Sequence, residues 1–172
     1  MPRTALAPHL DCYKGPAVLL PLILWHSAPE QVTVTEGSAR EALETLQLAT
    51  HADFITSLSI RVDLHQDIVQ SKTLSNILSL CPRVVQLTLE ISSATKFPGL
   101  NSATLCAKLL EVLRIPTSLE DLTLRWRLEG TDAFAVSDGP ELEMVLLTGL
   151  SNVRRVVSRQ MGIWHAMRGL HG

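Results

Sequence analysis

Aromatic residues are scarce in this chain, which has 172 residues but only three Trp, three Phe and one Tyr. Because 46% of the residues are nonetheless apolar, the core must be built from Leu, Val, Ile and Ala. A Leu-rich core with few aromatics fits stacked layers better than a sandwich packed around Trp and Tyr. The length suits one domain with a sizeable core.

Cysteine and net charge are also low. Cys12, Cys81 and Cys106 form no CxxC pair, which argues against a disulfide framework or a zinc site. We therefore expect a reducing compartment, cytoplasmic or nuclear. The formal net charge is -2, so no global field draws the protein to nucleic acid or to a membrane surface. Neither is expected as a partner.

No long apolar run is present. The longest, "AVLLPLILW" at residues 17–25, is interrupted by Pro21 and is too short to span a bilayer. A signal-peptide core is the other interpretation of this run. Asp11 and the length of the region upstream of the run fit that interpretation poorly.

Signatures of catalysis are missing as well. The sequence contains no GxSxG, HExxH, GxGxxG or P-loop. "HAD" at residues 51–53 and "DLH" at residues 63–65 place carboxylates beside imidazoles, without a third ligand at metal spacing. Cys81 and Cys106 lie in apolar helical patterns, where a buried filler is favoured over a nucleophile. The sequence predicts no enzyme, with no catalytic residues, no metal and no cofactor.

What is present is a repeat of ten residues. It reads "ITSLSIRVDL" at 55–64, "VVQLTLEISS" at 84–93 and "LEDLTLRWRL" at 119–128. Leu58, Leu87 and Leu122 are equivalent, with spacings of 29 and 35 residues. The alternation of apolar and polar residues predicts strands with one buried face. Weaker copies lie at 31–37 and 152–158, the latter with Ser158 where an apolar residue is expected.

Helical signals fill the segments between these strands. Ser38 and Glu41 form a capping box, and further helices are expected to begin at Ser71, Ser102 and near Asp138. The side chains expected to face inward are Ala39, Ala42, Leu43 and Leu46; Leu74, Ile77, Leu78 and Cys81; Leu105, Leu109, Leu110 and Leu113; and Leu142, Val145 and Leu146. Strand and helix alternating at 26–35 residues predict parallel strands with helical crossovers. The fold class expected is α/β: a short leucine-rich-repeat-like solenoid, with strands on the concave face and helices on the convex face.

The segment "LSNILSLCPRVVQLTLEI" at residues 74–91 resembles a leucine-rich repeat of the irregular, long type. Its "LCP" helix end is typical of repeats that follow F-boxes, and residues 28–64 are similar to the stretch after the F-box in fungal F-box-like proteins. The resemblance covers residues 30–157. It implies the substrate-binding repeat region of an F-box-type ubiquitin-ligase subunit.

An F-box itself needs three helices that open on a Leu-Pro motif, and no Leu-Pro opening precedes residues 16–28. Residues 16–28 are interpreted as a remnant of its last helix. The expected organisation is an N-terminal segment at residues 1–29, a leucine-rich-repeat-like domain at 30–158 and an irregular C-terminal tail at 159–172.

Outward side chains of the three clear repeats are predicted to stack in columns. The columns are Ser59, Thr88 and Thr123; Arg61, Glu90 and Arg125; and Asp63, Ser92 and Arg127, with Thr33 and Thr35 outward on the strand before. The residues predicted to bind a partner are Arg61, Asp63, Thr88, Glu90, Thr123, Arg125 and Arg127. They would present a positive patch to an acidic or phosphorylated peptide, or form only a surface ladder of charges. Trp126 has the parity of a core residue and is expected to be buried against the helices; the alternative interpretation is an exposed anchor for a partner.

Charge is uneven toward the C-terminus. Residues 129–143 hold five acids and no base, whereas residues 151–172 hold four arginines and no acid. We interpret these as solvated segments that attract each other; a basic tail that grips phosphate is the alternative. The function predicted is a protein-binding module, monomeric in isolation. The alternatives are a doubly wound α/β enzyme, whose second helical layer would bury Thr88 and Glu90, or a degenerate fragment without independent function.

Overall fold

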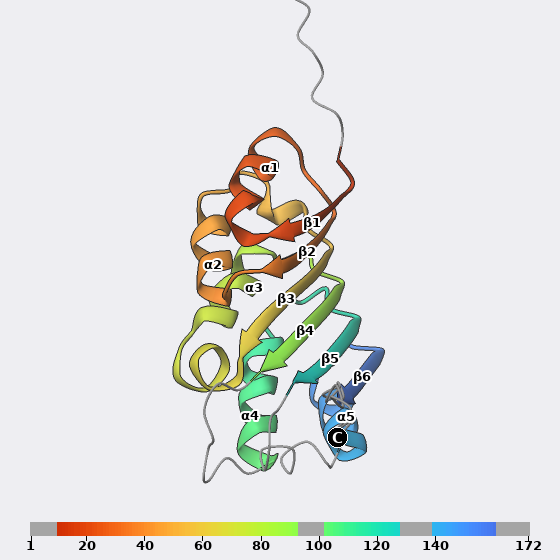
Figure 1. Ribbon diagram of the computed structural model, residues 1–172. Coiled ribbons are helices and arrows are strands. Elements are labelled where there is room, and N and C mark those ends of the chain that lie inside the picture. Colours follow the sequence, from red (N-terminus) through yellow and green to blue (C-terminus); the bar gives the residue numbers. More distant parts are fainter. Residues whose placement is uncertain (1–9, 93–101, 128–138, 161–172) are drawn as a thin grey trace, which may run out of the picture.

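The computed structural model describes residues 10–92, 102–127 and 139–160, and these form one sheet of six parallel strands (Figure 1). Its strands are β1 (Cys12–Pro16), β2 (Gln31–Glu36), β3 (Ser57–Asp63), β4 (Gln86–Ser92), β5 (Asp121–Arg127) and β6 (Arg155–Gln160). Their order in the sheet is their order in the chain. The α/β prediction with parallel strands is confirmed, and the curvature of a solenoid stays a prediction.

Helices connect the strands and lie on one side of the sheet. They are η1 (Ala17–Leu19), α1 (Leu20–His26), α2 (Ala39–Gln47), η2 (Ala52–Phe54), the π-helix η3 (Leu64–Gln70), α3 (Thr73–Leu80), α4 (Ser102–Leu113) and α5 (Gly139–Gly149). Because parallel crossovers are right-handed and each one adds a strand at the same edge, the helices fall on the same face. Figure 1 shows α1 to α4 along one side of the strands.

The register confirms the repeat. Leu58 lies opposite Leu87, and Leu87 lies opposite Leu122. The weaker copies extend the same row, with Val32 opposite Leu58 and Val156 opposite Leu122. The register of a parallel sheet follows its apolar pattern, because a slip of one residue would turn every buried side chain to the other face.

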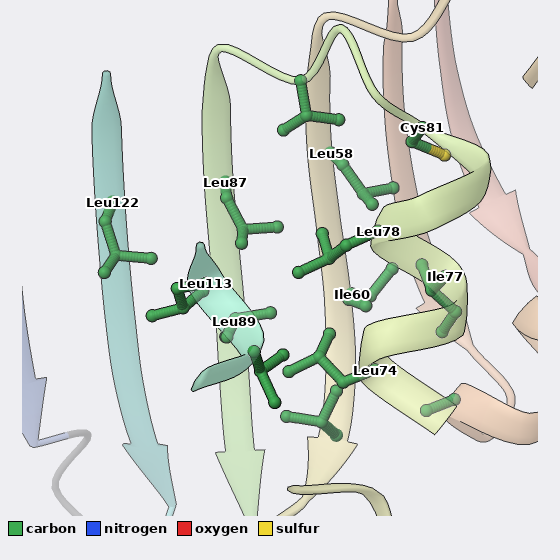
Figure 2. Packing of buried hydrophobic residues seen from close by; sticks show 14 of the residues in the cluster. Leu58, Ile60, Leu74, Ile77, Leu78, Cys81, Leu87, Leu89, Leu113 and Leu122 are labelled. Carbon is green, nitrogen blue, oxygen red and sulfur yellow. The ribbon is translucent and has the colours of Figure 1, made fainter. Parts of the chain in front are cut away.

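The core lies between the sheet and the helices. Figure 2 shows Leu58 and Ile60 of β3 and Leu87 of β4 pointing toward the side where Leu74 and Leu78 of α3 lie. All five side chains are almost completely buried. Each such Leu or Ile contributes about 1.5–3 kcal/mol relative to an exposed position. The face that carries these residues is therefore fixed by burial, and the other face is left polar.

The predicted start of α2 is observed, whereas the side chains predicted to cap α3 and α4 have other positions. The capping box of α2 is present: the Ser38 amide donates to Glu41 Oε2 over 2.7 Å, and the Glu41 amide donates to Ser38 Oγ over 3.2 Å. At α3 the N-cap is Lys72, and Ser71 Oγ instead accepts from the Thr73 amide, because η3 ends directly before it. Helix α4 begins at Ser102 itself. Asp138 lies outside the described residues.

Most side chains predicted to face inward from the helices are buried. Leu43, Leu110 and Cys106 are only partly buried, and Val145 is exposed, with 38% of its surface accessible. The expectation for Val145 is wrong. Helix α5 covers the last described strand, and its buried positions are Leu142 and Leu146, which lie one turn apart. An end helix buries a narrower stripe than a helix with neighbours on both sides.

Strand β1 and the π-helix η3 are among the elements that have no counterpart in the sequence prediction. Strand β1 lies within the segment 1–29 and pairs with β2, with Cys12 opposite Gln31. Its sequence "CYKGP" is short and contains Gly and Pro, which are depleted in strands. The π-helix η3 buries Leu64 and Ile68, four residues apart. At the other end β6 runs to Gln160, so the sheet includes the first two residues assigned to the tail.

Candidate partner-binding surface

The candidate surface is the face of the sheet opposite the helices, formed by the outward side chains of β3 to β6, and is called the polar face below. The register brings the predicted columns together: Ser59, Thr88 and Thr123; Arg61, Glu90 and Arg125; Asp63, Ser92 and Arg127. Each of these side chains is partly or fully exposed. The predicted site residues therefore share one accessible surface.

Glu90 lies at the centre of this surface and attracts three arginines. Its Oε2 is 3.7 Å from Arg61 Nη2 and 3.6 Å from Arg127 Nη2, and its Oε1 is 3.7 Å from Arg125 Nη1. The Glu90 side chain is 21% accessible, against 43–47% for the arginines. These separations exceed hydrogen-bond length. The arginines thus lean toward one carboxylate while their N–H donors keep capacity for a further acceptor.

Asp63, at the end of β3, caps the helix that follows it. Its Oδ1 accepts from the amides of His65 and Gln66 over 3.0 and 2.8 Å, and so caps the π-helix. Its own amide donates to Asp67 Oδ2 over 2.8 Å. Burial, with a contribution from the nearby charge of Asp63, raises the pKa of Asp67 despite that hydrogen bond. Asp63 was predicted to contact a partner, and the structure assigns part of its hydrogen-bonding capacity to capping.

Hydroxyl side chains line the polar face beside the charges. Thr88 of β4 and Thr123 of β5 lie directly opposite each other and are half-buried. Ser92 Oγ is 3.5 Å from the Val62 carbonyl oxygen, to which it donates. A hydroxyl both donates and accepts, so the threonines can meet either polar group of a peptide backbone.

Trp126 points into the core, as its parity predicts, and its side chain is fully buried. Its indole Nε1 donates to Ser158 Oγ over 2.8 Å. This contact explains the polar residue at a repeat position where the pattern expects an apolar one. A buried indole N–H needs an acceptor, and β6 supplies it. The Ser158 amide in turn donates to Glu143 Oε1 of α5 over 2.6 Å.

The sequence prediction did not include two arginines of β6 that belong to the polar face. Arg155 lies opposite Asp121, and Arg159 lies opposite Arg125. Both side chains are exposed. The signal was available: the spacing that aligns Val153 with Leu119 also aligns Arg159 with Arg125.

A doubly wound enzyme would bind its ligand at the carboxyl ends of the strands, near Asp63 and His65. A cavity of about 170 Å³ lies at the amino ends of β5 and β6, and its lining includes Thr117, Leu119 and Asn152. Among the residues with described placement, no three His, Cys, Asp or Glu side chains group as metal ligands. Burial, with a smaller effect of Asp53, raises the pKa of the Cys81 thiol to about 12.

Within the described part of the chain, every helix is too short or too polar to cross a membrane. The comparisons with known proteins gave no relative: no protein-family model, no curated protein and no solved structure matches the chain. The residues and their geometry are therefore the basis on which a function is proposed.

Proposed function

We propose that this protein is a recognition module whose polar face binds an acidic segment of a protein partner. The observation that carries the proposal is the gathering of Arg61, Arg125 and Arg127 around Glu90 on an accessible surface. Three guanidinium groups share one carboxylate, which leaves positive charge and N–H donors for carboxylates of a partner. Arginine is suited to this task because its planar fork binds carboxylate and phosphate with two hydrogen bonds.

The arrangement of strands supports a binding surface over a doubly wound enzyme. A doubly wound sheet reverses its strand order, and its ligand binds in the crevice at that reversal. The strand order here runs from β1 to β6 without reversal. Helices then fall on one face, and side chains such as Thr88 and Glu90 keep access to solvent.

A narrower proposal follows from the resemblance of residues 30–157 to the repeats of fungal F-box-like proteins. In this narrower proposal the polar face binds the substrate of an F-box-type ubiquitin ligase. The support is the resemblance alone. The proposal assigns adaptor binding to no residue of the N-terminal segment.

The test measures binding of fluorescent decapeptides to the full chain by anisotropy. One peptide library carries Asp and Glu at half of its positions, and a second carries Asn and Gln there. We expect the acidic library to bind and the neutral one to bind at least about tenfold more weakly, as charge-assisted contacts predict. Binding of the acidic library should weaken as NaCl is raised from 50 to about 500 mM, because salt screens exposed charges.

Two double variants with the same change of charge locate the binding. R125Q/R127Q removes two arginines of the polar face, whereas R40Q/R83Q removes two from other surfaces, where Arg40 pairs with Glu44 and Arg83 lies over Phe54. The first variant should lose acidic-peptide binding and the second should keep it. Equal affinity in both variants contradicts the proposal.

A further inference from the structure

In the column of the polar face that contains Glu90, the alternation of charge stops between β5 and β6. From β3 to β5 the column alternates as Arg61, Glu90 and Arg125. Strand β6 then places Arg159 directly opposite Arg125. Like charges at directly opposed positions destabilise a sheet. This boundary therefore carries a repulsion that a bound anion would relieve.

The neighbouring carboxylates do not remove this excess of positive charge. Glu90 is already shared by Arg61, Arg125 and Arg127, and Asp63 lies on β3, which β4 separates from β5. Arg159 is exposed, and across the ranges 10–92, 102–127 and 139–160 no carboxylate lies within ion-pair distance of it. Arg125 and Arg127, which share Glu90 with Arg61, and Arg159, which has no ion-pair partner among the described residues, therefore form a cluster of positive charge on β5 and β6.

We propose that this cluster binds the phosphate group of a phosphorylated peptide, an inference that rests on the proposed function of the polar face. Adjacent strands lie about 4.8 Å apart, so a small anion between β5 and β6 reaches side chains from both. A phosphomonoester carries a charge of about -1.5 to -2 near neutral pH and three acceptor oxygens. It can neutralise Arg125 and Arg159 together, whereas a carboxylate brings one charge, as Glu90 already does.

The chain offers a matched control on the same strand. Arg155 and Arg159 are both exposed, both lie on the polar face of β6 and are four residues apart. Arg155 lies opposite Asp121, and Arg159 lies opposite Arg125. R155Q and R159Q therefore make the same change of charge in opposite electrostatic surroundings.

The experiment compares three libraries of acidic decapeptides that differ only at a central position, which is phosphoserine, Glu or Ser. Affinities are measured by anisotropy for the full-length wild type, R159Q and R155Q. The wild type should bind the phosphoserine library about tenfold more tightly than the Glu library. R159Q should lose this preference, and R155Q should keep it within about twofold, since Arg155 has Asp121 opposite.

A second measurement detects the site without peptide. At equal ionic strength, inorganic phosphate should raise the Tm of the wild type above its value in chloride, because an anion that binds only the folded state stabilises it. R159Q should lack this shift, and R155Q should retain it. The unliganded R159Q should melt no lower than the wild type, since it removes a repulsion. This outcome separates a binding role of Arg159 from a purely structural one.

The results distinguish failure of this inference from failure of the proposed function. Equal affinity for phosphoserine and Glu peptides, or equal losses in R155Q and R159Q, overturns the phosphate site. If the acidic peptides still bind through Arg125 and Arg127 in that case, the proposed function stands. If no library binds in any form of the chain, both are overturned.

Discussion

The β3–β4 half and the β5–β6 half of the polar face differ in the column that contains Glu90: unlike charges lie opposite each other in the first half, and like charges do so in the second. Arg61 lies opposite Glu90 in the first half, and Arg125 lies opposite Arg159 in the second. The buried face differs in the same direction. The first half pairs two apolar side chains, Ile60 and Leu89, and the second pairs Leu124 with Ser158. The β3–β4 half keeps the repeat on both faces. The β5–β6 half departs from it on the buried face with Ser158, which accepts from the Trp126 indole, and on the polar face with Arg159.

The largest expected effect comes from the buried face, where one substitution can be made in each half. Val62 of β3 is fully buried, and Val156 lies on the last described strand with slightly more exposure. Val62→Ala should lower the free energy of unfolding by about 2–3 kcal/mol, and Val156→Ala by about 1–2 kcal/mol, from lost burial and the cavity left behind. Urea unfolding measures both. Equal losses would mean that the two halves are packed alike.

The next effect comes from Glu90, the carboxylate of β4 that one arginine of β3 and two arginines of β5 share. Glu90→Gln removes the partner of three arginines, and we expect a loss of about 1–2 kcal/mol, because Glu90 is mostly shielded from solvent. Asp121→Asn, the control on β5, should cost less than about 0.5 kcal/mol. Urea unfolding at low and high salt tests this. The difference between the variants should shrink in high salt, and its persistence there would count against an electrostatic origin.

A smaller effect should have opposite signs in the two halves. Arg61→Glu places a carboxylate opposite Glu90, and should destabilise the fold by about 0.5–1 kcal/mol. Arg159→Glu places one opposite Arg125, continues the alternation, and should stabilise the fold by about 0.2–0.5 kcal/mol. Thermal and urea unfolding in low salt provide the measurement. Destabilisation by both substitutions would show that Arg125 and Arg159 do not repel each other, and the phosphate site is inferred from that repulsion.

The smallest effect concerns pH and is confined to the first half, at the end of β3. Burial raises the pKa of Asp67 in the folded protein, so the folded state holds this proton more tightly than the unfolded state. The stability contributed by this proton is present below the ordinary Asp pKa of about 4 and is lost as the pH rises through the raised value. Asp67→Asn should lack that loss. A curve of unfolding free energy against pH that is identical in the variant would contradict this assignment.

Much of the polar face could be predicted because it depends on pattern alone. Leu58, Leu87 and Leu122 share a spacing and a parity, and the register of parallel strands follows from both. Once that row is fixed, the outward column of Arg61, Glu90 and Arg125 follows. Arg159 follows as well, if the same spacing is extended by one strand. The weak strand β1 could not be found this way, since "CYKGP" has no alternation to read.

The sequence by itself determined which residues face the core, which face solvent, and which stand in the same column, because these depend only on periodicity along the chain. The tertiary structure alone decided how those side chains share partners. In the folded chain three arginines lie near Glu90, Asp63 accepts from the amides of the π-helix, and the Trp126 indole donates to Ser158. Such contacts depend on separations of a few ångströms between distant residues and on competition for one acceptor, and neither is written in the spacing of residue types.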